Sequence, residues 1–154
     1  MAAMTYIIAP LLCPVCGRTT AEDDPTELVT RMLSAPGELR VGTRDDELSW
    51  PVVAASYPVL REPEEDEPVR FLETWTCPYC GSTNWARITF ADYTVTAIEA
   101  VPLDLETVSG AHAISPDVAK FYWDLTGGEL LFPDPNVWQP DFAERLLAAL
   151  REDA

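Results

Sequence analysis

The chain has 154 residues, of which 26 are Asp or Glu and 10 are Lys or Arg, so its formal net charge at pH 7 is -16. Hydrophobic residues make up 47% of it, which predicts one folded domain over residues 1–154 and excludes disorder through most of the chain. No apolar run approaches the ~18–20 residues that cross a bilayer, and residues 1–12 contain no Lys or Arg. We therefore expect no membrane association, no signal peptide and a cytoplasmic location.

The first part of the chain is predicted to form a strand and then a helix. Residues 6–12 form a short apolar strand that leads into the first cysteine. Asp24 begins a helix, with Pro25 at its first position and Glu27 as a capping partner. That helix should end at residues 34–37 and bury one apolar face, made of Leu28, Val29, Met32 and Leu33.

The next segments are predicted to be short strands and a loop. Residues 38–42 and 50–60 favour short strands, and the prolines of this region suit a sheet edge better than a sheet centre. Residues 61–68 are charged residues and prolines only. Such a segment cannot bury itself, and we expect a solvated loop without a site.

A strand and a hairpin are predicted around the second pair of cysteines. Val69, Phe71 and Trp75 alternate on one face of a strand that leads to Cys77. Residues 84–90 and 93–101 are rich in β-branched and aromatic residues, which favours two paired strands. Together with the strand over residues 6–12 that leads into the first cysteine pair, these strands should form one antiparallel sheet.

The C-terminal part, residues 105–151, is predicted to be helical. Ser115-Pro116 is a helix start, and apolar residues follow it at helical spacing until Gly127-Gly128. A second helix starts near Pro140-Asp141 and should bury Phe142, Leu146, Leu147 and Leu150.

The four cysteines fall into two copies of one motif, Cys13-Pro14-Val15-Cys16-Gly17 and Cys77-Pro78-Tyr79-Cys80-Gly81. A Cys-x-x-Cys pair in a tight turn points both sulfurs to the same side, and the following glycine supplies a positive φ at low cost. Two such turns that face each other make a tetrahedral cage of four sulfurs, which suits Zn²⁺ and also iron. We expect Cys13, Cys16, Cys77 and Cys80 to bind one structural metal ion, zinc in preference to iron.

These turns resemble the knuckles of zinc-ribbon proteins and of rubredoxins. The resemblance implies that all four cysteines are ligands and that each knuckle begins or ends a β-hairpin. Residues 18–76 form an insertion between the knuckles, much longer than the ~15–20 residues of a compact ribbon. The predicted fold is therefore α+β, with an antiparallel sheet, a four-cysteine, zinc-ribbon-like metal site, this insertion and two C-terminal helices.

Composition and motifs argue against nucleic-acid binding and against catalysis. Binding to nucleic acid needs a basic surface, whereas this chain has one lysine, Lys120, and nine arginines. The only histidine is His112, which we expect at the surface or at a helix end. No Gly-x-Ser-x-Gly motif and no glycine-rich phosphate loop occurs. We expect a protein that is not an enzyme.

Five tryptophans are many for a chain of this size, and tryptophan is favoured in binding hot spots. Trp75 and Trp85 are close to the second knuckle in sequence, and we expect them to pack around the metal site. Trp123 and Trp138 are the better candidates for exposure.

These observations predict a zinc-binding acidic protein that binds a protein partner with a basic surface, since strong negative potential speeds association with such partners. Small acidic proteins of this kind include bacterial immunity proteins and inhibitors, and the excess of arginine over lysine is typical of GC-rich bacteria. The alternative is a rubredoxin-like electron carrier with iron in the four-cysteine site. A third interpretation is that the acidity only maintains solubility.

Overall fold

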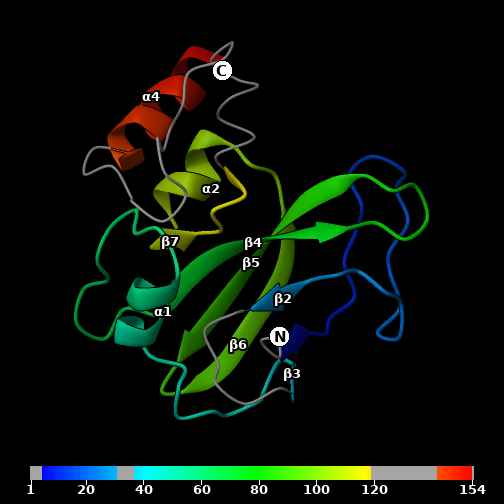
Figure 1. Ribbon diagram of the computed structural model, residues 1–154, viewed down its shortest axis with the longest axis horizontal. Coiled ribbons are helices and arrows are strands. Elements are labelled where there is room, and N and C mark those ends of the chain that lie inside the picture. The colour runs from blue at the N-terminus through cyan, green and yellow to red at the C-terminus, as the bar shows by residue number, and fades with distance from the viewer. Residues whose placement is uncertain (1–4, 31–36, 119–141, 154) are drawn as a thin grey trace.

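The computed structural model describes residues 5–30, 37–118 and 142–153 (Figure 1). In chain order the elements are β1 (Thr5–Ile7), β2 (Val29–Thr30), β3 (Gly37–Leu39), α1 (Trp50–Ser56), β4 (Val69–Thr76), β5 (Thr83–Ala91), β6 (Thr94–Val101), α2 (Leu105–Ser109), β7 (Ala113–Ile114) and α4 (Phe142–Asp153). The predicted mixture of helices and mainly antiparallel sheet is confirmed. None of the described helices is long and apolar enough to cross a membrane.

The larger sheet has the strand order β6-β5-β4-β7. Strands β4 and β5 pair antiparallel over their whole length, and β6 continues the antiparallel arrangement, whereas β7 pairs parallel to β4. The β5–β6 turn contains no glycine and holds Asp92 and Tyr93 at φ values of 51° and 62°. Two successive left-handed residues are typical of a two-residue hairpin turn. The strands predicted over 69–75, 84–90 and 93–101 are confirmed.

The smaller sheet has the order β2-β1-β3, with β1 antiparallel to β2 and parallel to β3. The prediction of one sheet is therefore wrong, because the strand before the first cysteine pair, β1, pairs with β2 and β3 and not with the larger sheet. The helix predicted from Asp24 is therefore wrong over the described residues, because Val29 is in a strand and Glu27 has a φ of 59°. The extended chain is held by long-range contacts: the Ile7 N–H donates to the carbonyl of Leu28 at 2.9 Å. Leu28 is fully buried. The rest of that predicted helix, residues 31–36, lies outside the described residues.

Three other predicted strands need correction. Residues 50–60 contain the helix α1 instead, with Pro51 in its first turn, where the missing N–H of proline is harmless. The strand predicted over 38–42 is shifted to β3. The strand predicted over 6–12 is regular only up to Ile7, and Leu12 makes an isolated bridge with Thr19.

The two faces of the larger sheet contact different apolar cores. Along β4, Phe71 and Trp75 contribute to one core and Leu72 to the other, as expected when successive side chains point to opposite faces. The first core also contains Cys13 and Cys77, Ile7 and Leu39 of the small sheet, and Leu28, which immediately precedes β2. The second core joins the sheet to α2 and α4 through Trp85, Val108, Ile114, Leu146 and Leu150. In Figure 1, α2 and α4 accordingly lie near β7, away from the small sheet.

The C-terminal helices match the prediction in part. The helix predicted near Pro140-Asp141 is confirmed as α4, with Leu146 and Leu150 buried. Of the helix predicted from Ser115-Pro116, Val118 is helical and buried, and the remainder lies outside the described residues, as do Trp123 and Trp138. A short helix, α2, precedes it and is capped by the Asp104 carboxylate, which accepts the Thr107 N–H at 2.8 Å.

Candidate metal centre

The first knuckle (residues 13–17) is a tight turn closed by backbone hydrogen bonds. The Gly17 N–H donates to the Cys13 carbonyl at 3.0 Å, and the Cys13 N–H donates to the Arg18 carbonyl at 2.9 Å. Gly17 has a φ of 76°, a conformation that glycine adopts without strain. This turn brings Cys13 and Cys16 to the same side of the backbone.

The second knuckle (residues 77–81) repeats the first. The Gly81 N–H donates to the Cys77 carbonyl at 2.8 Å, the Cys77 N–H donates to the Ser82 carbonyl at 2.9 Å, and Gly81 also has a φ of 76°. Because β4 ends and β5 begins on either side of it, this knuckle is the turn of a long β-hairpin. The larger sheet therefore positions Cys77 and Cys80 rigidly.

The four sulfurs lie together, although 60 residues (17–76) separate the two pairs in sequence. All four Sγ atoms are within 4.8 Å of one another, and both the Cys13–Cys80 and the Cys16–Cys77 Sγ distances are 3.7 Å. A tetrahedron with Zn–S bonds of ~2.3 Å has edges of ~3.8 Å, whereas a disulfide needs ~2.05 Å. The spacing of the sulfurs thus fits a metal ion, and all four cysteines are free thiols.

The candidate site is half buried. Cys13 and Cys77 are 0% exposed and belong to the first core, whereas Cys16 and Cys80 are exposed. One edge of the cluster is therefore embedded among apolar side chains and the other edge meets solvent. Because a tetrahedral ion bound by four cysteines has no open position, this donor set is typical of structural sites.

Two polar side chains that sequence reasoning missed lie against the sulfurs. The Ser82 Oγ is 3.0 Å from the Cys80 Sγ and 3.4 Å from the Cys13 Sγ. The Asn84 Nδ2 lies 3.7 Å from the Cys13 Sγ and donates to the Ser82 Oγ at 3.1 Å. Such partners orient the ligands and lower the charge on thiolates. The signal for them was the position of both residues just after the second knuckle, Ser82 immediately before β5 and Asn84 within it.

The pKa values of the cysteine thiols are shifted by the neighbouring side chains and by the other sulfurs. The Ser82 hydroxyl lowers the pKa of Cys13 to about 6 and also lowers the pKa of Cys80. The Arg18 N–H acts in the same direction on Cys16, but burial and the neighbouring thiols outweigh it and raise the pKa of Cys16 to about 11. Four thiolates repel one another at this spacing, and a bound cation would relieve that repulsion.

The knuckles are also joined by contacts that do not involve sulfur. The Arg18 guanidinium lies over the Tyr79 ring, 4.9 Å from its centroid. The Tyr79 hydroxyl donates to the Asp24 Oδ2 at 2.6 Å, which lowers the pKa of Asp24 and raises that of Tyr79. The Thr76 N–H donates to the Thr26 carbonyl at 2.7 Å. The segment 24–26, which follows the first knuckle, is therefore attached to the second knuckle and to the end of β4.

The expectation for His112 was wrong, because this residue is fully buried. Its Nδ1 accepts the Arg70 N–H at 3.0 Å, and its Nε2 lies 3.2 Å from the Glu67 Oε1 without an aligned hydrogen bond, a contact that is an ion pair only when the imidazole is protonated. Burial lowers the pKa of His112. The histidine therefore lies between β4 and the acidic loop 61–68. Its contacts with Arg70 and Glu67 do not involve the four cysteines.

The tryptophan prediction is confirmed for one residue. Trp75 is buried in the first core with Cys13 and Cys77, and its Nε1 donates to the Trp85 carbonyl at 3.1 Å. Trp85 itself lies in the second core, on the opposite face of the sheet.

No family model matches the chain, and searches of curated proteins and of solved structures return no similar protein. The resemblance to zinc ribbons and rubredoxins therefore depends on the two knuckles and on the spacing of their sulfurs.

Proposed function

We propose that this protein is a non-enzymatic zinc protein that acts by binding a second protein with a basic surface. The observation that carries the metal assignment is the cluster of four Sγ atoms within 4.8 Å of one another. With four sulfur ligands the ion has no free position for water or substrate, so its role is to hold the chain in shape. Under this proposal the protein acts through the binding of a partner to its surface.

The charge of that surface supports a basic partner. Several arginines already pair with carboxylates of this chain: Arg40 with Glu22 and Glu38, Arg61 and Arg70 with Glu67, and Arg87 with Glu99. The remaining carboxylates are in large excess, since the net charge is -16. Next to the first knuckle, Glu22, Asp23 and Glu27 are all exposed. Such a potential attracts basic proteins and repels nucleic acids.

Immunity-like or inhibitor-like neutralisation of a basic protein is the specific form of this proposal. The protein would act in the bacterial cytoplasm, where thiols stay reduced and able to bind metal. Association through a strongly charged surface is rapid and weakens as salt is added.

Metal analysis and affinity capture test the two halves of the proposal separately. Purified protein should be colourless and contain one zinc ion per chain. Affinity capture from the source organism should retain a basic protein, and exchange of Glu22 and Asp23 for Gln and Asn should weaken its binding. A matched variant, Glu106→Gln with Glu152→Gln, removes two exposed charges elsewhere. Absence of a stoichiometric metal contradicts the first half; binding that is insensitive to salt contradicts the second.

A rubredoxin-like electron carrier is the second candidate, and the exposure of Cys16 and Cys80 favours it. Electron transfer requires one edge of an iron centre near solvent, and these two sulfurs would supply that edge. An iron–thiolate centre absorbs visible light and changes oxidation state reversibly, whereas a zinc centre does neither. A red preparation with a reversible one-electron wave would replace the zinc proposal.

A further inference from the structure

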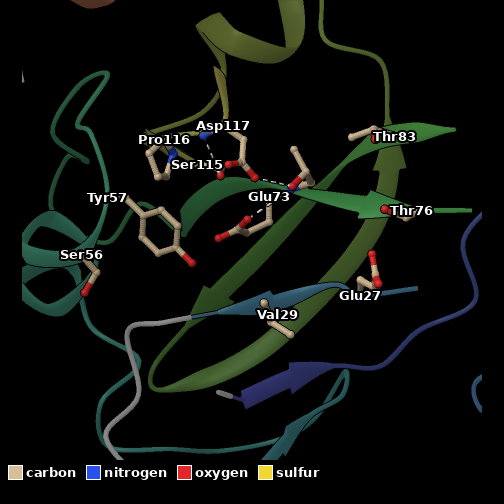
Figure 2. A pocket seen from close by; sticks show the side chains of 11 residues that line it. Glu27, Val29, Ser56, Tyr57, Glu73, Thr76, Thr83, Ser115, Pro116 and Asp117 are labelled. Carbon is tan, nitrogen blue, oxygen red and sulfur yellow. Dashed lines mark hydrogen bonds between the residues drawn. The ribbon is translucent and has the colours of Figure 1, made fainter. Parts of the chain in front are cut away.

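A cavity of about 330 Å³ lies where the ends of β2, β4 and α1 meet the chain after β7 (Figure 2). Its walls include Glu27, Tyr57, Glu73, Ser115 and Asp117. Cavities that hold small ligands start at about this size. The metal centre does not use these side chains, and the cavity is therefore a separate candidate site.

Glu73 is the unusual residue in this cavity. It occupies an inward position of β4, between Phe71 and Trp75, and is only 8% exposed. Its Oε2 accepts the Thr74 N–H at 3.2 Å, and Figure 2 shows the Tyr57 hydroxyl directed toward its carboxylate. A carboxylate at such depth normally has a cationic partner. Among the described residues Glu73 makes no ion pair.

The other groups that face Glu73 are acidic or neutral. Asp117 accepts the Thr74 hydroxyl proton at 2.8 Å, and its own N–H donates to the Ser115 Oγ at 3.2 Å. Glu27 lies on the opposite wall, and none of the described residues that line the cavity is Lys, Arg or His. Three carboxyl groups therefore face one small space without a neutralising charge.

We propose that this cavity binds the ammonium or guanidinium group of an organic cation, with the Glu73 carboxylate as its counter-ion. The cation donates N–H groups to Glu73, and the hydroxyl oxygens of Tyr57 and Ser115 are further acceptors within the same wall. The cation is either a free alkylamine or a Lys or Arg side chain of a protein. Binding of a free amine is independent of the protein partner proposed above.

Protonation of Glu73 gives the proposal a second, measurable consequence. Burial is the main cause that raises the pKa of Glu73 to about 7, with Asp117 adding to it, while hydrogen bonds from Tyr57, Thr74 and Ser115 act in the opposite direction. About half of the Glu73 carboxyls are thus ionised at pH 7, and a bound cation would shift them toward the carboxylate. Affinity for the cation should therefore rise about ten-fold from pH 6 to pH 8.

Isothermal titration calorimetry of the full-length, metal-loaded protein tests this proposal, with n-butylammonium, butylguanidinium, n-butanol and butyrate as probes. We expect saturable binding of the two cations only. Glu73→Gln keeps the size of the side chain and should weaken cation binding at pH 8 at least ten-fold and abolish the pH dependence. Glu64→Gln, which alters an exposed glutamate away from the cavity, should change neither.

The source of the cation is distinguished by adding Nα-acetyl-lysine amide to the probes. Tighter binding of this compound than of n-butylammonium indicates the side chain of a protein, whereas the reverse order indicates a free amine. The ¹³C shift of the Glu73 carboxyl, followed by NMR during the titration, reports occupancy even if Glu73→Gln fails to fold. Absence of saturable binding of both cations at pH 8, or equal binding to Glu73→Gln, would overturn the proposal. Because this test measures neither the zinc content nor the salt-dependent capture of a partner, its failure leaves the proposed function intact.

Discussion

Replacement of Cys77 by serine is the sharpest test of the metal centre. Cys77 is fully buried, and its Sγ lies 3.7 Å from that of Cys16. A serine hydroxyl is a poor zinc ligand, so the substitution leaves three sulfurs and weakens the connection between the two knuckles. Since binding of a structural metal is coupled to folding, we expect the variant to lose stability.

The magnitude follows from the length of chain that the metal closes into a loop. Residues 17–76 lie between the ligand pairs, and closing a loop of about 60 residues removes about 4 kcal/mol of chain entropy from the unfolded state on the scale used for disulfides. In a domain of this size 1 kcal/mol shifts Tm by about 2–4 °C. We therefore expect Tm to fall by up to about 8–16 °C, with the full decrease reached when loss of Cys77 releases the ion.

The assay compares thermal unfolding of the wild type and Cys77→Ser with zinc and, under a reductant, with a chelator. The difference in Tm should be large with zinc and should mostly disappear with the chelator, because neither protein is then cross-linked. Thr83→Ser, an exposed change beside the second knuckle, is the control and should leave Tm unchanged. An equal loss of Tm in both conditions would refute the reasoning, because the cysteine would then stabilise the fold through packing alone.

Three further predictions concern the surroundings of the site and the rest of the fold. Ser82→Ala and Asn84→Ala remove the polar neighbours of the sulfurs and should each weaken zinc binding about ten-fold in a competition titration with a chromophoric chelator, while Thr83→Ala should not. Leu146→Ala removes a fully buried side chain of the second core and should lower the free energy of unfolding by about 2–5 kcal/mol in urea; a value near zero would mean that α4 is not docked. Because the pKa of Glu73 in the folded protein is raised to about 7 from 4.5, ionisation of this group removes about 3 kcal/mol of stability as pH rises through this interval. Glu73→Gln should escape that loss, so its stability relative to the wild type should increase between pH 4.5 and pH 8.

The four-cysteine cluster and the strands around it could be predicted because their signals are local. The motif Cys77-Pro78-Tyr79-Cys80-Gly81 determines its own turn, and the alternation of Val69, Phe71 and Trp75 marks the inward face of β4. The meeting of the two knuckles was predicted from donor chemistry, because two Cys-x-x-Cys turns together supply the four sulfurs of one tetrahedral metal site. The described sulfur positions agree with that prediction.

The failed predictions are those in which distant contacts override local preference. Asp24, Pro25 and Glu27 make a good helix start, but the Thr26 carbonyl accepts a hydrogen bond from Thr76 and the chain continues as β2. No pattern within that segment specifies this pairing. For α1 the β-branched Val52 and Val53 favoured a strand, although Pro51 was a valid signal for the first turn of a helix.

The burial of the polar residues His112 and Glu73 was also not predicted from the sequence. His112 is solitary in the sequence, and its burial depends on the acidic loop that folds over it. Glu73 did carry a signal, because it stands at an inward position of an otherwise apolar stripe. A charged residue at such a position costs several kcal/mol unless something compensates it, and this makes it a candidate for function.

The separation of the two cores by the larger sheet has a consequence for how this molecule opens. Of the two cores, the first contains the buried cysteines of the cluster, Cys13 and Cys77, whereas α2 and α4 pack on the second. If the cluster holds the proposed ion, its withdrawal should therefore release the amides of β1–β3 to fast deuterium exchange while those of α4 stay protected. The protein would then open in two cooperative units, and supply of the ion would control one of them.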